Sequence, residues 1–552
     1  MMEEKKRHTY SLGVVLLALA VGLLAGVLFA PANDGGQRAM GLTSSNAMSD
    51  RLDVLTGIIN SYYVDNVDYD SLSTVVLQSV LSSLDPHSTY LTPKEFDKEA
   101  ELLQGRFEGI GLTLFWINDT LYASSVNKGS PAADAGIHPG DRILAVDTVK
   151  VSGVKLEGGV SSAVKMIRGP RFTKVTLTID RKGWDTPKKI KVRRDIIRHA
   201  SVPAAVMIDK TTGYVHVERF AESTASEFHA ALLQLKGEGM KHLVLDLRSN
   251  GGGSLESAIE MADELLPKGD LIVFTEGAHQ RRYNNYATSG GLFEEGGLTV
   301  LLNEFSASAS EVVAGAVQDN DRGTIAGRRS FGKGLVQRQF DLLSGDAVLL
   351  TIARYYTPSG RCIQRPYDKG SDAYYMDYLN RILSDYKDAD SLFNATVDTS
   401  QSFLTKNGRK VYGGGGIQPD IIIPYISDTN WIYYNRLLDE KVLEEVLYHQ
   451  IHDHYADLMK KYPTSDVFVA RYTVDDATWQ RILSTADKKG IRRHQGCIQK
   501  YGQHIRNRYK ALMADVLFDN NAFYRVSLRN DTELQRALAA KNTPANPRRN
   551  GK

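Results

Sequence analysis

The spacing of apolar residues along the chain changes from one region to the next. Apolar side chains recur every three or four positions in 52–59 and in 75–84, which predicts two helices. Short apolar runs broken by Gly and Pro turns follow from 110 to 181, a pattern typical of a compact β domain. Helical spacing returns beyond Pro424, most clearly in 505–517.

Strands alternate with helices in the middle of the chain. An apolar strand at 243–247 leads into a helix expected from Leu255, and a strand at 298–302 leads into a helix expected from Ala309. This alternation is typical of βα units that bury a parallel sheet. Two longer strands, ending near Tyr356, close the segment.

An uncharged apolar run of 19 residues, Leu12 to Ala30, lies near the N-terminus. Its length is close to the roughly 20 residues that a helix needs to cross a bilayer. Lys5, Lys6 and Arg7 precede it, which favours a cytoplasmic N-terminus. The sequence therefore predicts either a membrane anchor or a cleaved signal peptide, with the remainder of the chain exported.

Composition excludes several classes of protein. The 552 residues include 67 Lys and Arg against 65 Asp and Glu, so the net charge of +2 offers no basic surface for nucleic acid. Cys362 and Cys497 are too few for a disulfide framework, and two unpaired thiols are expected, with one bridge left open. His452 and His454 stand two apart, so on a helix they diverge and make a poor metal pair.

Ser308 stands in a run of small residues between an expected strand and an expected helix. A serine there presents its hydroxyl at the positive end of the helix, where the next backbone N–H can stabilise an oxyanion. The alternative is a helix cap, since Ser308 and Glu311 also fit the Ser-x-x-Glu capping box. This segment alone favours the cap.

A second strand-to-helix turn, Asn250-Gly-Gly-Gly-Ser254, can supply a free N–H to a neighbouring site. It matches neither a dinucleotide fingerprint nor a phosphate loop. Lys333 lies between two glycines, and burial would favour its neutral, basic form. Lowering its pKa from about 10.4 to about 7 requires roughly 4 kcal/mol from the site. Gln337 is uncharged and could orient the amine, although a solvated lysine is the simpler explanation of this segment alone.

Together these segments resemble the C-terminal processing, or tail-specific, serine peptidases, whose core is similar to the crotonase fold. Ser-Ala-Ser-Glu and Phe-Gly-Lys-Gly-x-x-Gln match the family's motifs, and Ser308 and Lys333 lie 25 residues apart, as in that family. The family often has proline where Gly251 stands. The resemblance implies a nucleophile, a general base, its orienting amide, two oxyanion N–H groups and two supporting carboxylates: Ser308, Lys333, Gln337, Ala309 with Gly252, and Asp319 with Glu311.

The resemblance extends to a PDZ domain of the bacterial kind. Residues 107–112 (Phe-Glu-Gly-Ile-Gly-Leu) are similar to its carboxylate-binding loop, and 129–143 continue the pattern. Consecutive free N–H groups in such a loop capture a terminal carboxylate, while the next strand edge pairs with an extended peptide. The residues implied in binding a substrate's C-terminus are Gly109, Ile110, Gly111 and Leu112.

The resemblance thus implies an α/β multidomain protein with a crotonase-like (ββα) core, an inserted PDZ domain, an N-terminal helical domain and a helical C-terminal extension. The expected segments are a signal peptide or membrane anchor (1–32), a linker (33–49), a helical domain (50–104), the PDZ domain (105–184), the peptidase core (185–365 and 413–424), an insertion (366–412), a helical region (425–541) and a disordered tail (542–552).

The expected activity is endoproteolysis of exported proteins, in the periplasm or at the inner membrane facing it, with no cofactor and no metal. Expected partners are polypeptides with exposed C-termini, a regulatory protein and a second copy of the chain, with membrane association through the N-terminal segment. Two rival classes remain: a noncatalytic PDZ scaffold and a crotonase-like acyl-CoA enzyme. A Ser-His-Asp triad through His87 and Asp85 is disfavoured, because Asp-Pro-His-Ser is typical of a turn that ends a helix.

Overall fold

The computed structural model describes residues 47–540 except 155, 343, 384–399 and 425–430. The apolar run at 12–30 and the tail from 542 therefore lie outside the described residues. The chain divides into one unit up to Ser73 and a second from Thr74 onward. Within the described ranges, no helix has both the length and the apolar character needed to cross a membrane.

The two expected N-terminal helices are present. Helix α2 spans Ala47–Tyr62 and α3 spans Tyr69–Ser82. Helix α4 (Pro93–Gln104) follows, with Thr92 as N-cap and Gly105 in the left-handed conformation at its end. Between α3 and α4, within the segment expected as a helical domain, the chain also forms a short strand, β1 (Thr89–Leu91), because these residues pair with a strand far along the chain.

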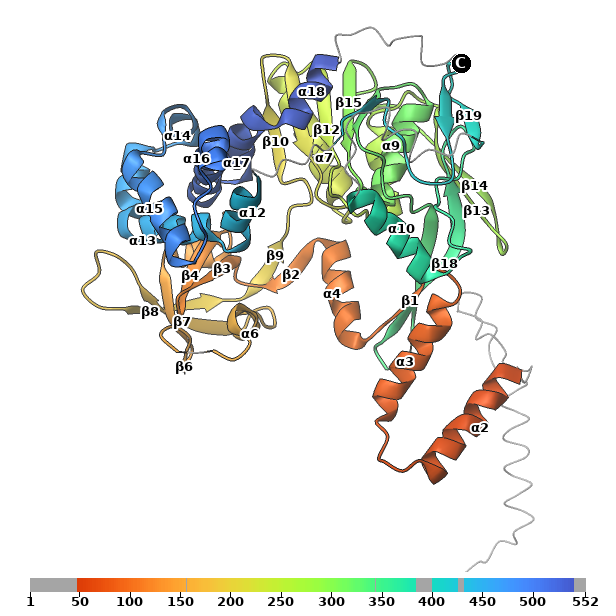
Figure 1. Ribbon diagram of the computed structural model, residues 1–552, viewed down its shortest axis with the longest axis horizontal. Helices are drawn as coiled ribbons and strands as arrows, with labels where there is room; N and C mark the ends of the chain where they lie inside the picture. The colour runs from red at the N-terminus through yellow and green to blue at the C-terminus, as the bar shows by residue number, and fades with distance from the viewer. Residues whose placement is uncertain (1–46, 155, 343, 384–399, 425–430, 541–552) are drawn as a thin grey trace, which may run out of the picture. The chain divides into compact units, whose positions relative to one another are not determined.

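A six-stranded sheet, parallel apart from its first pair, is at the centre of the second unit (Figure 1). Its strands, in spatial order, are β10 (Ala204–Met207), β11 (Thr212–His216), β12 (His242–Asp246), β15 (Gly297–Leu302), β16 (Thr324–Gly327) and β21 (Ile421–Ile422). The strands expected at 243–247 and 298–302 are confirmed as neighbouring parallel strands.

Each face of this sheet packs against helices. Along β12, Leu243 and Leu245 enter one hydrophobic core and Val244 enters another, as the two-residue period of a strand requires. The first core is shared with α7 (Thr224–Gly237), α8 (Leu255–Asp263) and α9 (Ala309–Asp319). Every residue of α9 is buried, so the helix that follows Ser308 is held rigidly.

A second sheet is antiparallel. Its strands are β1, β18 (Ala347–Tyr356), β13 (Leu271–Gly277) and β14 (Gln280–Tyr286), with β17 (Leu335–Asp341) also paired to β18. Strands β17 and β18 confirm the two longer strands predicted from the sequence. The strand that follows Lys333 is thereby joined to β1 through β18, which brings the turn before β1 close to the lysine.

The compact β domain is a third sheet of six strands. They are β3 (Leu112–Ile117), β4 (Thr120–Val126), β5 (Arg142–Val146), β7 (Lys174–Asp180) and β8 (Lys188–Arg193), with β6 (Val149–Lys150) paired to β5. The sheet continues past residue 184, where the domain was expected to end, because β8 pairs along β7. A ribbon of β2 (Arg106–Gly109) and β9 (Asp195–Arg198) leads into and out of it.

The C-terminal region is helical, as expected, and contacts two other parts of the chain (blue in Figure 1). Tyr448 packs against Phe115 of β3, with ring centroids 5.0 Å apart. Leu528 and Leu534 enter the core on the second face of the central sheet. The helices are α12 (Trp431–Asp439), α13 (Val442–Lys461), α14 (Ser465–Arg471), α15 (Asp476–Lys488), α16 (Gln495–Leu517), α17 (Asn520–Ser527), η1 (Leu528–Asn530) and α18 (Thr532–Ala540).

The expected insertion, 366–412, contributes α10 (Ser371–Leu383) and a hairpin of β19 (Ser402–Leu404) and β20 (Lys410–Tyr412).

Candidate active site

Ser308 occupies the sharp turn between β15 and α9. Its backbone has φ 56° and ψ −115°, a conformation that non-glycine residues rarely adopt and that costs about 1–3 kcal/mol. Such strain is concentrated at functional sites. In the described part of the chain, the N–H of Ala309 has no hydrogen-bond acceptor. The turn therefore presents a serine beside a free N–H at the start of a buried helix.

Glu311 connects the serine turn to the lysine segment. Its Oε2 accepts the N–H groups of Ser308 (2.8 Å) and Lys333 (2.9 Å). Its Oε1 accepts the Ser330 hydroxyl (2.6 Å) and the N–H of Gly332 (2.7 Å). Burial raises the pKa of this carboxyl, and the four hydrogen bonds oppose that rise. The residue expected as a helix cap and a support is thus a bridge between two loops that are distant in sequence.

Lys333 donates from Nζ to Oε1 of Gln337, 2.6 Å away. Burial lowers the pKa of the half-buried lysine amine, while the charges of Asp85, Glu311 and Glu99 act in the opposite direction. The lowered pKa shifts Lys333 toward the neutral amine that is expected from the sequence. Within the described residues, no hydrogen bond joins Lys333 Nζ to the hydroxyl of Ser308.

Gln337 is oriented by a residue that sequence reasoning set aside. Its Nε2 donates to the backbone carbonyl of His87 (2.7 Å), which directs Oε1 toward Lys333. Asp85 fixes this carbonyl, because its carboxylate accepts the N–H groups of His87 and Ser88 (both 2.8 Å) and the Ser88 hydroxyl (2.6 Å). The Asp-Pro-His-Ser turn was visible in the sequence, but its long-range contact was not.

The imidazole of His87 faces away from this chemistry and toward α10. Its Nε2 lies 3.0 Å from the Tyr374 hydroxyl. Burial, with the nearby charges of Lys333 and Arg365, lowers the pKa of His87 to about 4, so the ring is neutral at physiological pH. Arg365, 4% exposed, lies over the rings of Tyr374 (3.9 Å) and Phe331 (4.5 Å). The insertion helix is therefore fastened over the loop that carries the lysine.

Gly252 lies against the serine turn. A Cβ added to it would stand 2.7 Å from Cβ of Ser308, and its φ of 103° also favours glycine. Its N–H donates to Oδ1 of Asn250 (2.9 Å), so the predicted oxyanion donor has an internal partner in this arrangement. The backbone carbonyl of Asn250 in turn accepts the N–H of Ala307 (3.0 Å) and the hydroxyl of Ser310 (2.9 Å).

Tyr355 is a site residue that the sequence did not reveal. Its hydroxyl lies 3.0 Å from the backbone carbonyl of Ser308 and 2.7 Å from that of Lys333. Burial raises the pKa of this phenol well above its usual value, so it stays a donor. The strand pattern placed Tyr355 in β18 but gave no signal for a side chain that contacts two loops.

Asp319 supports a different turn. It ends α9, about 16 Å along the helix from Ser308 at 1.5 Å per residue. Its carboxylate forms a fully buried ion pair with Arg361 (2.7 Å) and accepts the hydroxyls of Thr357 and Ser359. Asp319 therefore anchors the turn after β18 and does not reach the nucleophile.

The predicted carboxylate-binding loop joins β2 to β3. Ile110 and Gly111 are buried, and their N–H groups have no acceptor among the described residues. Gly111 has φ 75°, and a Cβ there would stand 2.3 Å from Cβ of Ser130. Leu112 begins β3, which lies at the end of its sheet and beside α6 (Gly159–Ile167). Two free N–H groups thus precede a strand with an open edge.

The remaining candidates have structural roles or none. Nδ1 of His452 donates to the backbone carbonyl of Gly140 (2.9 Å), in a buried contact between α13 and the β domain. No cluster of three metal-ligating side chains occurs in the ranges that the structure describes. Neither Cys362 nor Cys497 forms a disulfide with another described residue, which agrees with the expected unpaired thiols.

Two family models match the chain at these features. Residues 211–369, which include Ser308 and Lys333, match the peptidase family S41, and residues 122–181 match the PDZ domain. Residues 433–519 match a family of unknown function. The chain is thus a peptidase of the serine class that carries a PDZ domain, and the fold class expected from the sequence is confirmed.

Curated relatives narrow the class further. The carboxy-terminal-processing protease of Bartonella bacilliformis is 40% identical over 311 residues, which cover 55% of this chain and 70% of the relative. The carboxyl-terminal-processing protease of Synechocystis is 34% identical over 52% of this chain and 68% of the relative. The chain belongs to the C-terminal processing peptidase family.

Solved structures are also similar to the chain. The photosystem II D1 C-terminal processing protease is 26% identical, with 57% of this chain and 83% of that one covered and a TM-score of 0.32. The PDZ domain of the carboxy-terminal protease from Vibrio cholerae, solved with a peptide, is 33% identical over 17% of this chain and 98% of that one, with a TM-score of 0.15.

Proposed function

We propose that this peptidase is an exported endopeptidase that selects substrates by their C-termini and cleaves them through an acyl-enzyme formed on Ser308, with Lys333 as general base. The observation that carries the proposal is the joint fixation of the two segments. Glu311 accepts a backbone N–H from both Ser308 and Lys333, and the Tyr355 hydroxyl contacts the carbonyls of the same two residues.

The amine chemistry follows from its contacts. A neutral Lys333 that donates one N–H to Gln337 keeps its lone pair for the proton of Ser308. As Oγ bonds to the scissile carbonyl carbon, that proton passes to Nζ and the carbonyl oxygen becomes an oxyanion. Collapse of this tetrahedral intermediate breaks the C–N bond, and Lys333 Nζ delivers its proton to the leaving amine. The amine of Lys333 then deprotonates a water molecule, which hydrolyses the ester.

The oxyanion requires N–H donors aimed at its position. Ala309 offers one, because its N–H is free at the start of α9. Gly252 is the second in this proposal, supported by its close approach to Ser308. Its N–H donates to Asn250, so the proposal requires that this short turn exchange one hydrogen bond when substrate binds.

Substrate selection rests on the PDZ domain. The free N–H groups of Ile110 and Gly111 suit a terminal carboxylate, and the open edge of β3 suits the extended residues before it. Leu112, with its partly buried neighbours Leu114 and Trp116, gives this strand an apolar character, so apolar C-termini are the proposed ligands.

Export and association complete the proposal. The apolar run at 12–30 with its preceding positive charges supports delivery to the periplasm, either anchored in the inner membrane or after cleavage of a signal peptide. Exposed apolar side chains on α2, namely Val54, Leu55 and Ile58, support pairing with a second copy or with a regulatory protein.

Turnover of a peptide with an apolar C-terminus tests the assignment. Ser308→Ala and Lys333→Ala should each abolish cleavage, whereas Ser226→Ala and Lys210→Ala, matched changes at exposed positions, should not. Activity retained in either of the first two variants would exclude the assignment. Binding of the peptide by the wild-type chain without any turnover would instead support the noncatalytic scaffold.

A further inference from the structure

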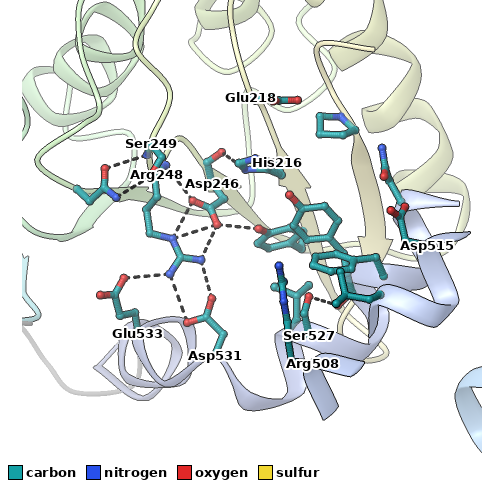
Figure 2. Close-up of a pocket in the computed structure, with 18 residues that line it drawn as sticks. His216, Glu218, Asp246, Arg248, Ser249, Arg508, Asp515, Ser527, Asp531 and Glu533 are labelled. Carbon is teal, nitrogen blue, oxygen red and sulfur yellow. Dashed lines mark hydrogen bonds and ion pairs between the residues drawn. The ribbon is translucent and has the colours of Figure 1, made fainter. Parts of the chain in front are cut away.

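A cavity of about 740 Å³ lies outside the proposed active site (Figure 2). Neither Ser308 nor Lys333 lines it. His216 and Asp246, which end the parallel strands β11 and β12, form one wall, and residues of α16 to α18 form the other. Ligands of open α/β sheets bind beyond the carboxyl ends of the strands, in clefts of roughly 300–1,000 Å³. Position and size therefore fit a binding site.

Aromatic rings line the cavity. Tyr524 faces Tyr214 with centroids 5.8 Å apart and His216 with centroids 5.4 Å apart. The hydroxyl of Tyr214 donates to Asp246 (2.7 Å), which fixes that ring. Phe523 continues the lining beside Tyr524, at a centroid distance of 5.2 Å. Such a surface suits an aliphatic stem or the face of a cation.

Negative charge predominates in the lining, which contains five carboxylates and two guanidinium groups. Arg248 satisfies three of the carboxylates: it contacts Asp246 and Asp531 at 2.6 Å each and Glu533 at 3.0 Å (Figure 2). The other two carboxylates have weaker partners: Glu218 lies 3.8 Å from His199, and Asp515 interacts with Arg508.

The carboxylates of Glu218 and Asp515 accept no hydrogen bond within the described part of the chain. Burial raises the pKa of the Asp515 carboxyl, and the neighbouring Asp519 adds to this, so a positive charge placed there would be stabilised. Two donors also lack partners among the described residues: Nε of Arg508, which is buried, and the hydroxyl of Tyr524. The cavity thus offers acceptors for a cation and donors for carbonyl oxygens.

The cavity adjoins the loops of the proposed active site. Ser249 and Asn303 line it, and they are joined by hydrogen bonds of 2.8 Å (Ser249 N–H to Oδ1) and 3.0 Å (Nδ2 to the Ser249 hydroxyl). Ser249 immediately precedes Asn250, which holds the N–H of Gly252. Asn303 begins the loop to Ser308 and also accepts the N–H of Phe305 (3.1 Å). A ligand in this cavity would therefore contact both loops, through Ser249 and Asn303.

We propose that this cavity binds a lysine or arginine side chain of a polypeptide. The carboxylates of Glu218 and Asp515 receive the charged group, the ring of Tyr524 packs on its stem, and Arg508 and Tyr524 take carbonyl oxygens of the peptide. Occupancy shifts the Ser249–Asn303 contact and thereby the rate of catalysis, and this second part rests on the proposed function.

Calorimetry with the full-length Ser308→Ala chain tests the binding itself. The probe is acetyl-Ala-Ala-Lys-Ala-Ala-amide, with the Gln analogue and n-butylamine as comparison ligands. The Lys peptide should bind saturably and more tightly than either. Added Asp515→Asn or Glu218→Gln should weaken it about tenfold, near 1.4 kcal/mol. Asp457→Asn, the same change at an exposed position on α13, should have no effect.

Three results would overturn the binding site: no saturable binding at millimolar peptide, equal affinity for the Gln peptide, or equal affinity in the Asp515→Asn and Glu218→Gln chains. Binding of n-butylamine as tight as that of the peptide would overturn the role of Arg508 and Tyr524.

Coupling is tested with the wild-type chain. Saturating Lys peptide should change kcat for a peptide with an apolar C-terminus, and the change should disappear in Asp515→Asn. Binding without any change in kcat would refute the coupling. A wild-type chain that cleaves no peptide would refute the proposed function, while the calorimetric result would still decide the binding site.

Discussion

Replacing Glu311 with Gln tests whether one carboxylate holds the two catalytic segments together. The substitution keeps the shape of the side chain but turns one acceptor oxygen into an NH₂ donor. Placed toward the N–H groups of Ser308 and Lys333, that NH₂ faces two donors. Placed the other way, it faces the N–H of Gly332 and the Ser330 hydroxyl, which can rotate to accept. One or two of the four hydrogen bonds are therefore lost, and those that remain no longer have a charged acceptor.

The magnitude follows from those contacts. Hydrogen bonds to a charged group contribute about 1.5–3 kcal/mol each, so losing one or two of them costs about 1.5–6 kcal/mol. The variant no longer buries a charge, an unfavourable feature of the native residue that also raises its pKa, so a net loss near 3 kcal/mol is expected. Separation of the two loops by about 1 Å would in addition lower kcat about 100-fold.

The assay is urea unfolding at pH 7 together with turnover of a peptide that ends in apolar residues. Glu256→Gln serves as control, because Glu256 is exposed in the first turn of α8 and should change stability by no more than about 0.5 kcal/mol. An unfolding free energy and a kcat of Glu311→Gln that both match the control would refute the bridging role.

Three further predictions concern neighbouring residues. Gly252→Ala should lower kcat about 100-fold because its Cβ would stand 2.7 Å from Cβ of Ser308, whereas Gly251→Ala, with nothing within 4 Å, should stay near wild type; equal rates would contradict the proposed packing. Tyr355→Phe should cost about 1–3 kcal/mol in urea unfolding and lower kcat more than KM changes; unchanged kcat would show that the hydroxyl does not position the loops. Because the pKa of His87 is lowered from 6.5 to about 4, the unfolded chain takes up this proton first as pH falls. The free energy of unfolding should therefore drop by about 3 kcal/mol between pH 6.5 and 4. His87→Gln should remove that part of the drop, and identical pH profiles of the two chains would contradict the prediction.

Local features of the fold were predictable from the sequence. The strands at 243–247 and 298–302 and the helices after them carry their own periodicity, so their positions in the structure follow from residue pattern alone. Strand β1 was not predictable in this way, because three residues show no period and are held by pairing with β18. The extent of the β domain was missed for the same reason at β8.

In the candidate site, too, only the features with a local sequence signal were predictable. Ser308 and Lys333 stand in motifs, so resemblance could select them. Glu311 showed a capping signal and, through the resemblance, a supporting role, but its contacts with Ser330 and Gly332 depend on tertiary structure and were not visible. The cavity between the central sheet and the C-terminal helices had no signal at all, because its lining comes from segments more than 200 residues apart.

The central claim is that Ser308 forms the covalent intermediate. Its most direct test is to quench the wild-type chain in acid during turnover of a slowly hydrolysed peptide ester and to locate the added acyl mass by peptide mapping. An adduct is expected on the peptide that contains Ser308, absent from Ser308→Ala and not formed by Lys333→Ala at neutral pH. Turnover with no adduct on Ser308, or with an adduct on another residue, would contradict it.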